Sequence, residues 1–119
     1  MEENIKKLFE INPKQLPSTI PLFPLNNVLL LPFGKLPLNI FEEKYIKLTL
    51  DSLRTHRMIG IIQPKNNNNE FFMMGCIGKI TSYIETPDYR IVLNLEGVCR
   101  FVIQDYQLTS KGFYQASID

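Results

Sequence analysis

Few side chains in this 119-residue sequence have the types and spacing that acid–base or nucleophilic chemistry needs. Glu42 and Glu43 are paired carboxylates, but consecutive residues of a helix point about 100° apart and do not share a target. The single histidine, His56, falls at the end of an expected helix, where a cation interacts favourably with the helix dipole. A catalytic base also needs a nucleophile within reach, and the sequence suggests none for His56.

Serine and nucleotide chemistry have equally little support. Lys79 with Ser82, or Lys111 with Ser110, leaves a serine–lysine dyad open on spacing alone, but such neighbours are common in any sequence. The sequence contains no P-loop, no glycine-rich dinucleotide motif and no nucleophile elbow. We therefore expect no catalytic residue, and neither ATP hydrolysis nor proteolysis by this chain.

The two cysteines, Cys76 and Cys99, are far apart and lack the short spacing of a metal-binding or redox pair. Free cysteine is often buried as a small apolar side chain, which is the role we expect for both. A zinc site or disulfide would need partners that the sequence does not supply. We expect no metal and no cofactor.

Composition describes an ordinary globular domain. Hydrophobic residues make up 45% and charged residues 21%, and the formal net charge is +1. Without a basic field, neither nucleic acid nor an anionic membrane is an expected partner. No apolar run approaches the roughly 18 residues of a transmembrane helix, and residues 1–16 lack the apolar core of a secretory signal. We expect a cytoplasmic protein of one domain.

The stretch from residue 20 to residue 45 organises the chain. Prolines interrupt its apolar runs, and because each proline fixes φ and removes a donor, the runs must be short strands or extended segments. One main helix is expected near residues 42–56, with Phe41, Tyr45 and Leu48 on its buried face. Residues 1–16 are expected to be a lead-in, with a short amphipathic helix over residues 2–11.

The second half of the sequence has the patterns of β-structure. A buried strand is expected over 58–62, followed by a polar loop over 65–69. Apolar residues then alternate along 90–95, and Gly97 is expected to mark a bulge because the alternation restarts after it. The fold class is mainly β (α+β), a pseudo-barrel of six to eight short strands with one main helix. Further strands are expected over 71–75, 76–84 and 113–118, with a hairpin turn at 86–88.

Four motifs then appear in a specific order. They read PLFPL followed by LPLNIFE from residue 21 to residue 42, RMIG at 57–60, GCIGKI at 75–80 and LEGVCRF at 95–101. Together they resemble the N-terminal, substrate-binding domain of the Lon protease family, especially bacterial proteins that carry this domain alone. The positions that carry the resemblance as structural motif residues are Pro24, Pro37, Phe41, Glu42, Tyr45, Gly60, Gly78, Glu96, Gly97 and Arg100.

The resemblance implies a PUA-like fold and a non-catalytic role in recognising protein substrates or partners. Unfolded or apolar-rich polypeptides are the implied ligands, and a protease or ATPase partner would link the chain to ATP-dependent protein degradation and protein quality control. Complete Lon proteases add ATPase and peptidase domains. The resemblance also implies that residues 17–119 form the β-rich lobe of this domain and that the helical lobe that follows it in relatives is absent.

Two positions depart from the family pattern. Glu43-Lys44 replaces a proline and an arginine, so an ion pair made by that arginine in relatives is in doubt, since lysine lacks the bidentate guanidinium. Tyr89 replaces the glycine of a Pro-Asp-Gly turn, so the hairpin is expected to differ in type. Glu42 is expected to cap the helix, and Glu96 and Arg100 to form a structural pair or a solvated face.

The candidate binding residues are large apolar side chains beside turns. Phe33 lies at the Pro-Phe-Gly turn, and the other candidates are Phe71, Phe72, Met73 and Met74. The cluster over 71–74 is either a core strand or a strand with one exposed face, either Phe72 with Met74 or Phe71 with Met73. Methionine adapts to varied partners, which suits the recognition of unfolded segments.

Two other functions and one association remain open from the sequence. A PUA-like fold binds RNA in other families, and distant relatives of this domain hold a small ligand in an aromatic cage. Near-zero net charge argues against RNA, and the lack of tryptophan argues against such a cage. We also expect weak self-association, through the edge at 71–74 or through an uncovered last strand.

Overall fold

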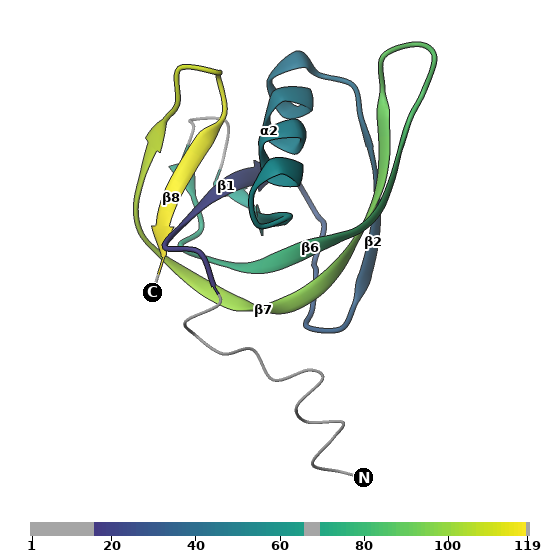
Figure 1. Cartoon of the computed structure of the whole chain (residues 1–119). Helices are drawn as coiled ribbons and strands as arrows, with labels where there is room; N and C mark the ends of the chain where they lie inside the picture. The colour runs from purple at the N-terminus through teal and green to yellow at the C-terminus, as the bar shows by residue number, and fades with distance from the viewer. Residues whose placement is uncertain (1–15, 66–69, 119) are drawn as a thin grey trace, which may run out of the picture.

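The computed structural model describes residues 16–65 and 70–118. They form one helix within a mainly β structure, so the predicted fold class is confirmed (Figure 1). The helix expected over residues 2–11 and most of the polar loop at 65–69 lie outside the described residues. The elements in chain order are β1 (Thr19–Pro24), β2 (Lys35–Ile40), α2 (Glu43–Arg54), β3 (Met58–Ile62), β4 (Pro64–Lys65), β5 (Glu70–Phe71), β6 (Met74–Glu85), β7 (Ile91–Leu108) and β8 (Tyr114–Ile118).

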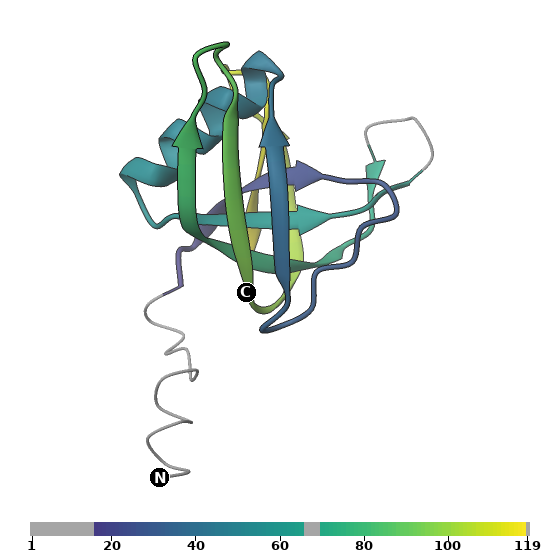
Figure 2. The same cartoon turned by 90° about the vertical axis from the view of Figure 1, so that its right-hand side faces the viewer.

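The main sheet closes on itself. Its order is β2-β7-β6-β3-β1-β8, and β8 also pairs with β7, so β1, β3, β6, β7 and β8 form a ring. All neighbours are antiparallel except β1 and β3, which run parallel with α2 in the connection between them (Figure 1). β2 lies outside the ring, paired with the first half of β7 (Figure 2).

β6 and β7 are longer than the short strands predicted from the sequence. β7 is a single strand of 18 residues, and β6 has 12. The bulge predicted at Gly97 is confirmed: Ile77 faces Cys99 while Gly78 faces Gly97, so Val98 is the extra residue. A bulge bends a strand and increases its twist. Because of this bend, β7 pairs with β2 through its first half and with β8 in the ring through its second half.

The helix starts one residue later than expected and buries the predicted face, with Leu48 buried and Tyr45 half-buried, but without Phe41. Glu42 is the N-cap, as predicted, with extended backbone dihedrals, but its side chain makes no capping hydrogen bond. Phe41 is 68% exposed, because it lies in the bend before the helix and does not follow the helical period. The buried face consists of Leu48, Thr49 and Ser52.

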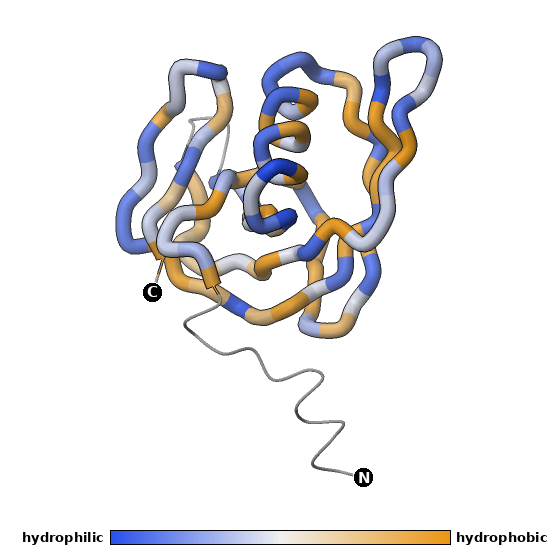
Figure 3. Tube along the Cα trace, viewed as in Figure 1, coloured by the Kyte–Doolittle hydropathy of each residue, from blue (hydrophilic) through white to orange (hydrophobic). Residues whose placement is uncertain are grey.

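Two apolar clusters hold the fold together. One lies inside the ring and includes Leu22, Ile77 and Phe101. The other lies between α2 and the outer face of the sheet and includes Leu48 and Leu93. The two clusters follow from the alternation of side chains along the same strands, seen as alternating orange and blue segments in Figure 3.

The last strand is covered on both edges. β8 pairs with β1 through residues such as Ala116, and also with β7, so the expectation of an uncovered last strand is wrong. A strand with both neighbours in place presents no free hydrogen-bonding edge. Tyr114 packs edge-on against Phe71, with ring centroids 5.2 Å apart.

In the β6–β7 hairpin, Tyr89 stands at the position where the resemblance led us to expect glycine. Tyr89 itself adopts the left-handed conformation, with φ of 62°. Its N–H donates to the Thr86 carbonyl at 3.2 Å, and the Thr86 hydroxyl accepts from the Arg90 N–H at 3.0 Å. The predicted turn is therefore present, with a tyrosine in strained backbone.

Within residues 16–65 and 70–118, no helix has the length and apolar character required to cross a lipid bilayer.

Candidate functional site

An apolar groove of about 350 Å³ opens on the outer face of the ring. One wall is the loop over residues 28–31, between β1 and β2, and the opposite wall is formed by Phe72 and Met74. We call this hollow the outer groove. Its full lining is Val28, Leu29, Leu30, Leu31, Ile61, Ile62, Gln63, Phe72, Met74, Gly75, Cys76 and Arg100.

Strand register builds the floor of the outer groove. Phe23 faces Ile61, Ile61 faces Cys76, and Cys76 faces Arg100 across neighbouring strands. Directly opposed residues project from the same side of a sheet, so these four side chains form one row across its outer face. The row runs from buried Phe23 to exposed Arg100.

The loop wall has one anchored leucine between two exposed ones. Leu30 is 5% exposed and belongs to the apolar cluster beneath α2. Its neighbours Leu29 and Leu31 are 74% and 47% exposed. The loop thus fixes its position through a single buried side chain and presents the adjacent two.

Backbone contacts hold this loop against β7. The Phe33 N–H donates to the Gly97 carbonyl at 2.8 Å, and the Gly97 N–H donates to the Gly34 carbonyl at 2.8 Å. A β-carbon at Gly97 would lie 2.0 Å from the Leu31 carbonyl oxygen, so only glycine permits this approach. The bulge and the glycine together seat the loop that forms the wall.

Gly75 plays the same part at the floor. A β-carbon there would lie 2.5 Å from the Ile61 carbonyl oxygen and 2.6 Å from an Ile62 methyl group. A side chain therefore has no room at this point, and the groove lining at Gly75 is backbone. Two glycines of the family motifs therefore shape the outer groove without adding a side chain to it.

Residues 71–74, which include the opposite wall of the groove, were predicted to be either a core strand or a strand with one exposed face, and the structure shows neither. Phe71 is 5% exposed and packs with Tyr106 and Tyr114, so it is a core residue. Phe72, Met73 and Met74 are 49%, 43% and 58% exposed. Three successive side chains are exposed because residues 72 and 73 lie between β5 and β6, where strand alternation is interrupted.

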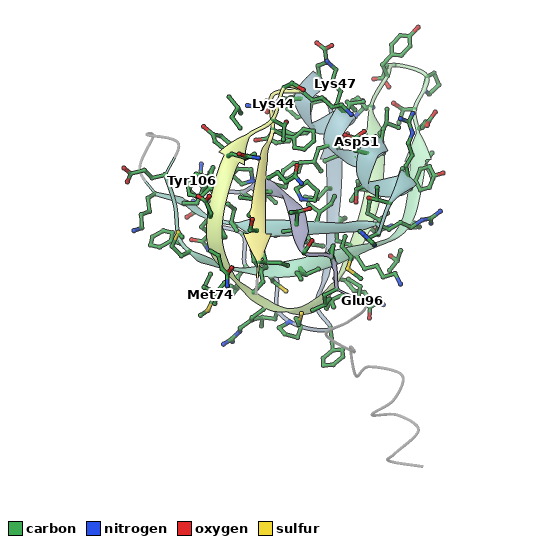
Figure 4. The ribbon with its side chains drawn as sticks, turned by 60° about the vertical axis from the view of Figure 1, so that its left-hand side comes forward. Lys44, Lys47, Asp51, Met74, Glu96 and Tyr106 are labelled. Carbon is green, nitrogen blue, oxygen red and sulfur yellow. The ribbon has the colours of Figure 1, made fainter. Side chains whose placement is uncertain are left out.

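The remaining wall contacts extend the apolar surface. Met74 faces Val102 across β6 and β7, and Val102 is 47% exposed. Figure 4 shows Met74 on the lower side of the molecule, while Lys44, Lys47 and Asp51 lie on α2 at the top. Met73 and Phe33, two of the predicted binding residues, are exposed but do not line the groove.

Arg100 is the one charged residue in the groove lining. Among the described residues, the four ion pairs lie on α2 and on the β6–β7 and β7–β8 turns, and none includes Arg100. The predicted pairing of Glu96 with Arg100 is therefore not formed; Arg100 has the alternative role of an exposed residue. Lys65 adds a second cation at the rim, 5.4 Å from the centroid of the Phe72 ring.

The Cys76 thiol in the groove floor lacks the features of a reactive cysteine. Cys76 is 4% exposed, and burial raises the pKa of its thiol, an effect that a backbone hydrogen bond with Val98 and, less, the charge of Arg100 partly oppose. Burial also raises the pKa of Cys99. Because the thiolate is the reactive form, both cysteines behave as the apolar residues predicted from the sequence. In the described part of the chain, no three His, Cys, Asp or Glu side chains gather as metal ligands.

The candidate serine–lysine pairs do not meet as dyads. The Ser82 hydroxyl accepts a hydrogen bond from Asn94 at 2.9 Å, and Lys111 donates to Asp51 at 2.7 Å. No hydrogen bond joins Ser82 to Lys79, or Ser110 to Lys111, within the described residues. His56 lines a separate polar hollow near the end of α2.

Sequence reasoning missed the loop wall. Residues 28–31 form an unbroken apolar run bounded by asparagines and a proline, which we expected to be a short strand or extended segment, and none of the four was a candidate binding residue. A short apolar run without alternation is equally typical of a buried strand such as β3, so the sequence held no signal that separates the two. Gln63 carried no signal; its side-chain amide donates to the Val28 carbonyl at 3.4 Å.

Comparison with known proteins agrees with the sequence motifs. The model of the family described as the ATP-dependent protease La (LON) substrate-binding domain matches residues 19–119. Lon protease of Flavobacterium johnsoniae is 29% identical over 115 residues, and that of Endomicrobium trichonymphae is 27% identical over 110 residues. These matches cover 92% and 87% of the chain but only 14% of each relative.

Solved structures show the same fold. The crystal structure of a Lon N-terminal domain protein from Xanthomonas campestris superposes with a TM-score of 0.74 at 28% identity, covering 87% of this chain and 59% of that one. The N-terminal domain of Mycobacterium avium complex Lon protease gives a TM-score of 0.64 at 11% identity, covering 85% and 53%. The second similarity concerns the fold alone.

Proposed function

The chain belongs to the family of Lon substrate-binding domains, and from this premise we propose that it binds apolar segments of unfolded polypeptides in the outer groove. The observation that carries the proposal is the gathering of exposed apolar side chains around one hollow. Four of them line or border it from separate parts of the chain: Leu29, Leu31, Phe72 and Met74. Scattered exposed apolar residues are normal, whereas a contiguous set beside a groove marks an interaction surface.

The chemistry of the walls suits varied ligands. Leucine and methionine are unbranched at Cβ, and the methionine thioether adapts its shape to different partners. The walls present side chains rather than an open strand edge, so recognition depends on apolar contact more than on a fixed backbone register. Such a surface favours unfolded segments of many sequences over one folded partner.

The proposed module is non-catalytic and works in the cytoplasm with a separate protease or ATPase activity. The support is the family membership together with the names of its relatives, which are Lon proteases. In this proposal, purified protein hydrolyses neither casein nor ATP. Turnover that disappears on replacing one named side chain of this chain would overturn that part.

The test compares two pairs of exposed apolar residues. Phe72→Ser/Met74→Ser changes the groove wall, and Phe41→Ser/Ile84→Ser changes side chains that are 68% exposed and do not line the groove. Binding of a fluorescent, reduced and unfolded client is measured by anisotropy. We expect the groove variant to bind about tenfold more weakly. Full burial of such a side chain contributes about 1.5–3 kcal/mol, and a tenfold loss of affinity, about 1.4 kcal/mol, corresponds to partial burial of the two.

The control variant is expected to bind within about twofold of the unsubstituted protein, the range of surface effects outside an interface. Circular dichroism and thermal unfolding establish that both variants are folded. Unchanged affinity in the groove variant, or an equal loss in both variants, would contradict the proposed site.

A further inference from the structure

Arg100 lines the outer groove, and within the described residues its charge has no acidic partner. It is exposed, it ends the row of side chains that forms the groove floor, and no described acidic residue pairs with it. The other residues of the lining carry no charge. An unpaired cation beside an apolar hollow fits an anionic group on whatever occupies the hollow.

The positive charge reaches the floor and is reinforced at the rim. Arg100 is the cross-strand partner of Cys76, and both residues line the groove. Lys65 lies over Phe72 on the opposite wall. Glu70 is the cross-strand partner of Lys65, but it is outside the groove lining and makes no ion pair with Lys65.

We propose that the outer groove selects apolar segments that carry an aspartate or glutamate, with the side-chain carboxylate paired to the Arg100 guanidinium. This inference rests on the proposed function, since the apolar walls must first hold a polypeptide. Guanidinium and carboxylate form a planar, bidentate pair that fixes the position of the carboxylate along the groove. Apolar walls alone would hold a polypeptide in several registers. The ion pair between the carboxylate and Arg100 would select one of them.

The alternatives with a negative charge fit less well. A nucleic acid presents many phosphates and needs several cations, whereas the groove offers one lining arginine and apolar walls. A terminal carboxylate would suit a closed end, but Arg100 also lines a second hollow beside Leu16 and Ile118. Arg100 is exposed and borders both hollows, so it does not form a closed end of the groove, which favours a side-chain carboxylate within a segment.

The test uses two labelled peptides with identical apolar residues and with both ends blocked. One carries a central aspartate and the other carries asparagine at the same position, so the pair differs in charge and hardly in size. Exposed ion pairs of this kind stabilise by a fraction of a kcal/mol to about 1 kcal/mol, so we expect the aspartate peptide to bind about two- to fivefold more tightly at low salt. The preference should shrink as salt is raised.

Arg100→Gln is expected to remove the preference while the asparagine peptide binds as before. The matched control is Arg54→Gln, which neutralises an exposed arginine of α2 outside the groove lining and should keep the preference. Equal binding of the two peptides to the unsubstituted protein would overturn this inference and leave the proposed function standing. Failure of both peptides, with the unfolded client also unbound, would overturn both.

A third peptide separates the source of the carboxylate. It keeps the asparagine sequence but has a free C-terminus, so its only anionic group is the terminal carboxylate. We expect it to bind less tightly than the blocked aspartate peptide. The opposite order, lost in Arg100→Gln, would overturn the assignment to a side chain within a segment.

Discussion

The outer face of the sheet is covered in two different ways. On one half lies α2, which buries Leu48 and Thr49 completely and stacks Tyr45 on Phe23 with ring centroids 4.3 Å apart. On the other half lies the loop over residues 28–31, which buries only Leu30 and leaves Leu29 74% exposed. The same strands, β3, β6 and β7, underlie both coverings.

The difference teaches how a small domain divides stability from binding. A helix repeats its apolar positions every three or four residues and satisfies its own backbone, so it seals a sheet along its whole length. A loop interrupted by proline and glycine has no such period and is held by single anchors and a few backbone hydrogen bonds. The helix-covered half therefore supplies core, and the loop-covered half supplies an accessible apolar surface.

The largest effect should come from the helix-covered half. Leu48→Ala removes a side chain with no exposed surface and should lower the free energy of unfolding by about 2–5 kcal/mol, the cost of a cavity in a packed core. Leu29→Ala, the same change on the loop-covered half, should alter it by less than about 0.5 kcal/mol. Urea unfolding of both variants measures the contrast. Similar losses of unfolding free energy would contradict the assignment of stability to the helix-covered half.

Gly97→Ala should unsettle the loop-covered half specifically. The added β-carbon would lie 2.0 Å from the Leu31 carbonyl oxygen, so the loop must move. We expect a loss of about 1–3 kcal/mol in unfolding free energy together with weaker client binding. Gly60→Ala is the matched control, because its β-carbon would meet only side chains inside the ring, Phe101 at 2.9 Å and Leu22 at 3.1 Å, and not the loop. If the control lost as much binding as Gly97→Ala, the loop would not be the cause.

The thiol in the groove floor offers a chemical measure of occupancy. Because burial raises the pKa of Cys76, less of its thiol is ionised at pH 7.5 than in a free cysteine. In a Cys99→Ser background we expect a thiol reagent to react with Cys76 at least about tenfold more slowly than with free cysteine, and faster as the pH rises. A bound apolar peptide should slow it further; a rate that peptide leaves unchanged would place the ligand away from the groove.

Much of this fold could be predicted because its signals are local. Alternation fixed the faces of Ile91 and Leu93, a broken alternation marked the bulge at Gly97, and a short apolar run identified β3. What was mispredicted depends on pairing between distant segments. The closing of the ring by β8 and the exposure of Phe41 follow from register and chain direction, and neither leaves a local pattern.

The candidate site was predicted only in part for the same reason. Phe72 and Met74 were candidates because large apolar side chains followed a polar loop, but Phe71 belongs to the core. The other wall and Arg100 join them only through the register of β3, β6 and β7 and the approach of the loop to Gly97. The groove is assembled from four separated segments, so no single stretch of sequence predicts it.

The smallest expected effects come from two turns that carry the same backbone strain on the two halves. Phe33 and Tyr89 have φ of 67° and 62°, a conformation that costs a residue with a β-carbon about 1–2 kcal/mol and glycine nothing. Glycine offsets part of this gain through the greater freedom of the unfolded chain, about 0.5–1 kcal/mol. Tyr89→Gly should therefore stabilise by up to about 1 kcal/mol, since its side chain is 91% exposed.

The same change at Phe33 should separate stability from binding. Phe33→Gly relieves equal backbone strain, so its unfolding free energy should stay within about 1 kcal/mol of the unsubstituted protein. It also removes an aromatic ring that is 57% exposed at the end of the loop wall. We expect client affinity to fall about twofold in Phe33→Gly and to stay constant in Tyr89→Gly, since only the first turn continues the loop beside the groove. Equal affinity in both variants would confine the binding surface to the groove lining, and a loss in Tyr89→Gly would extend it to the helix-covered half.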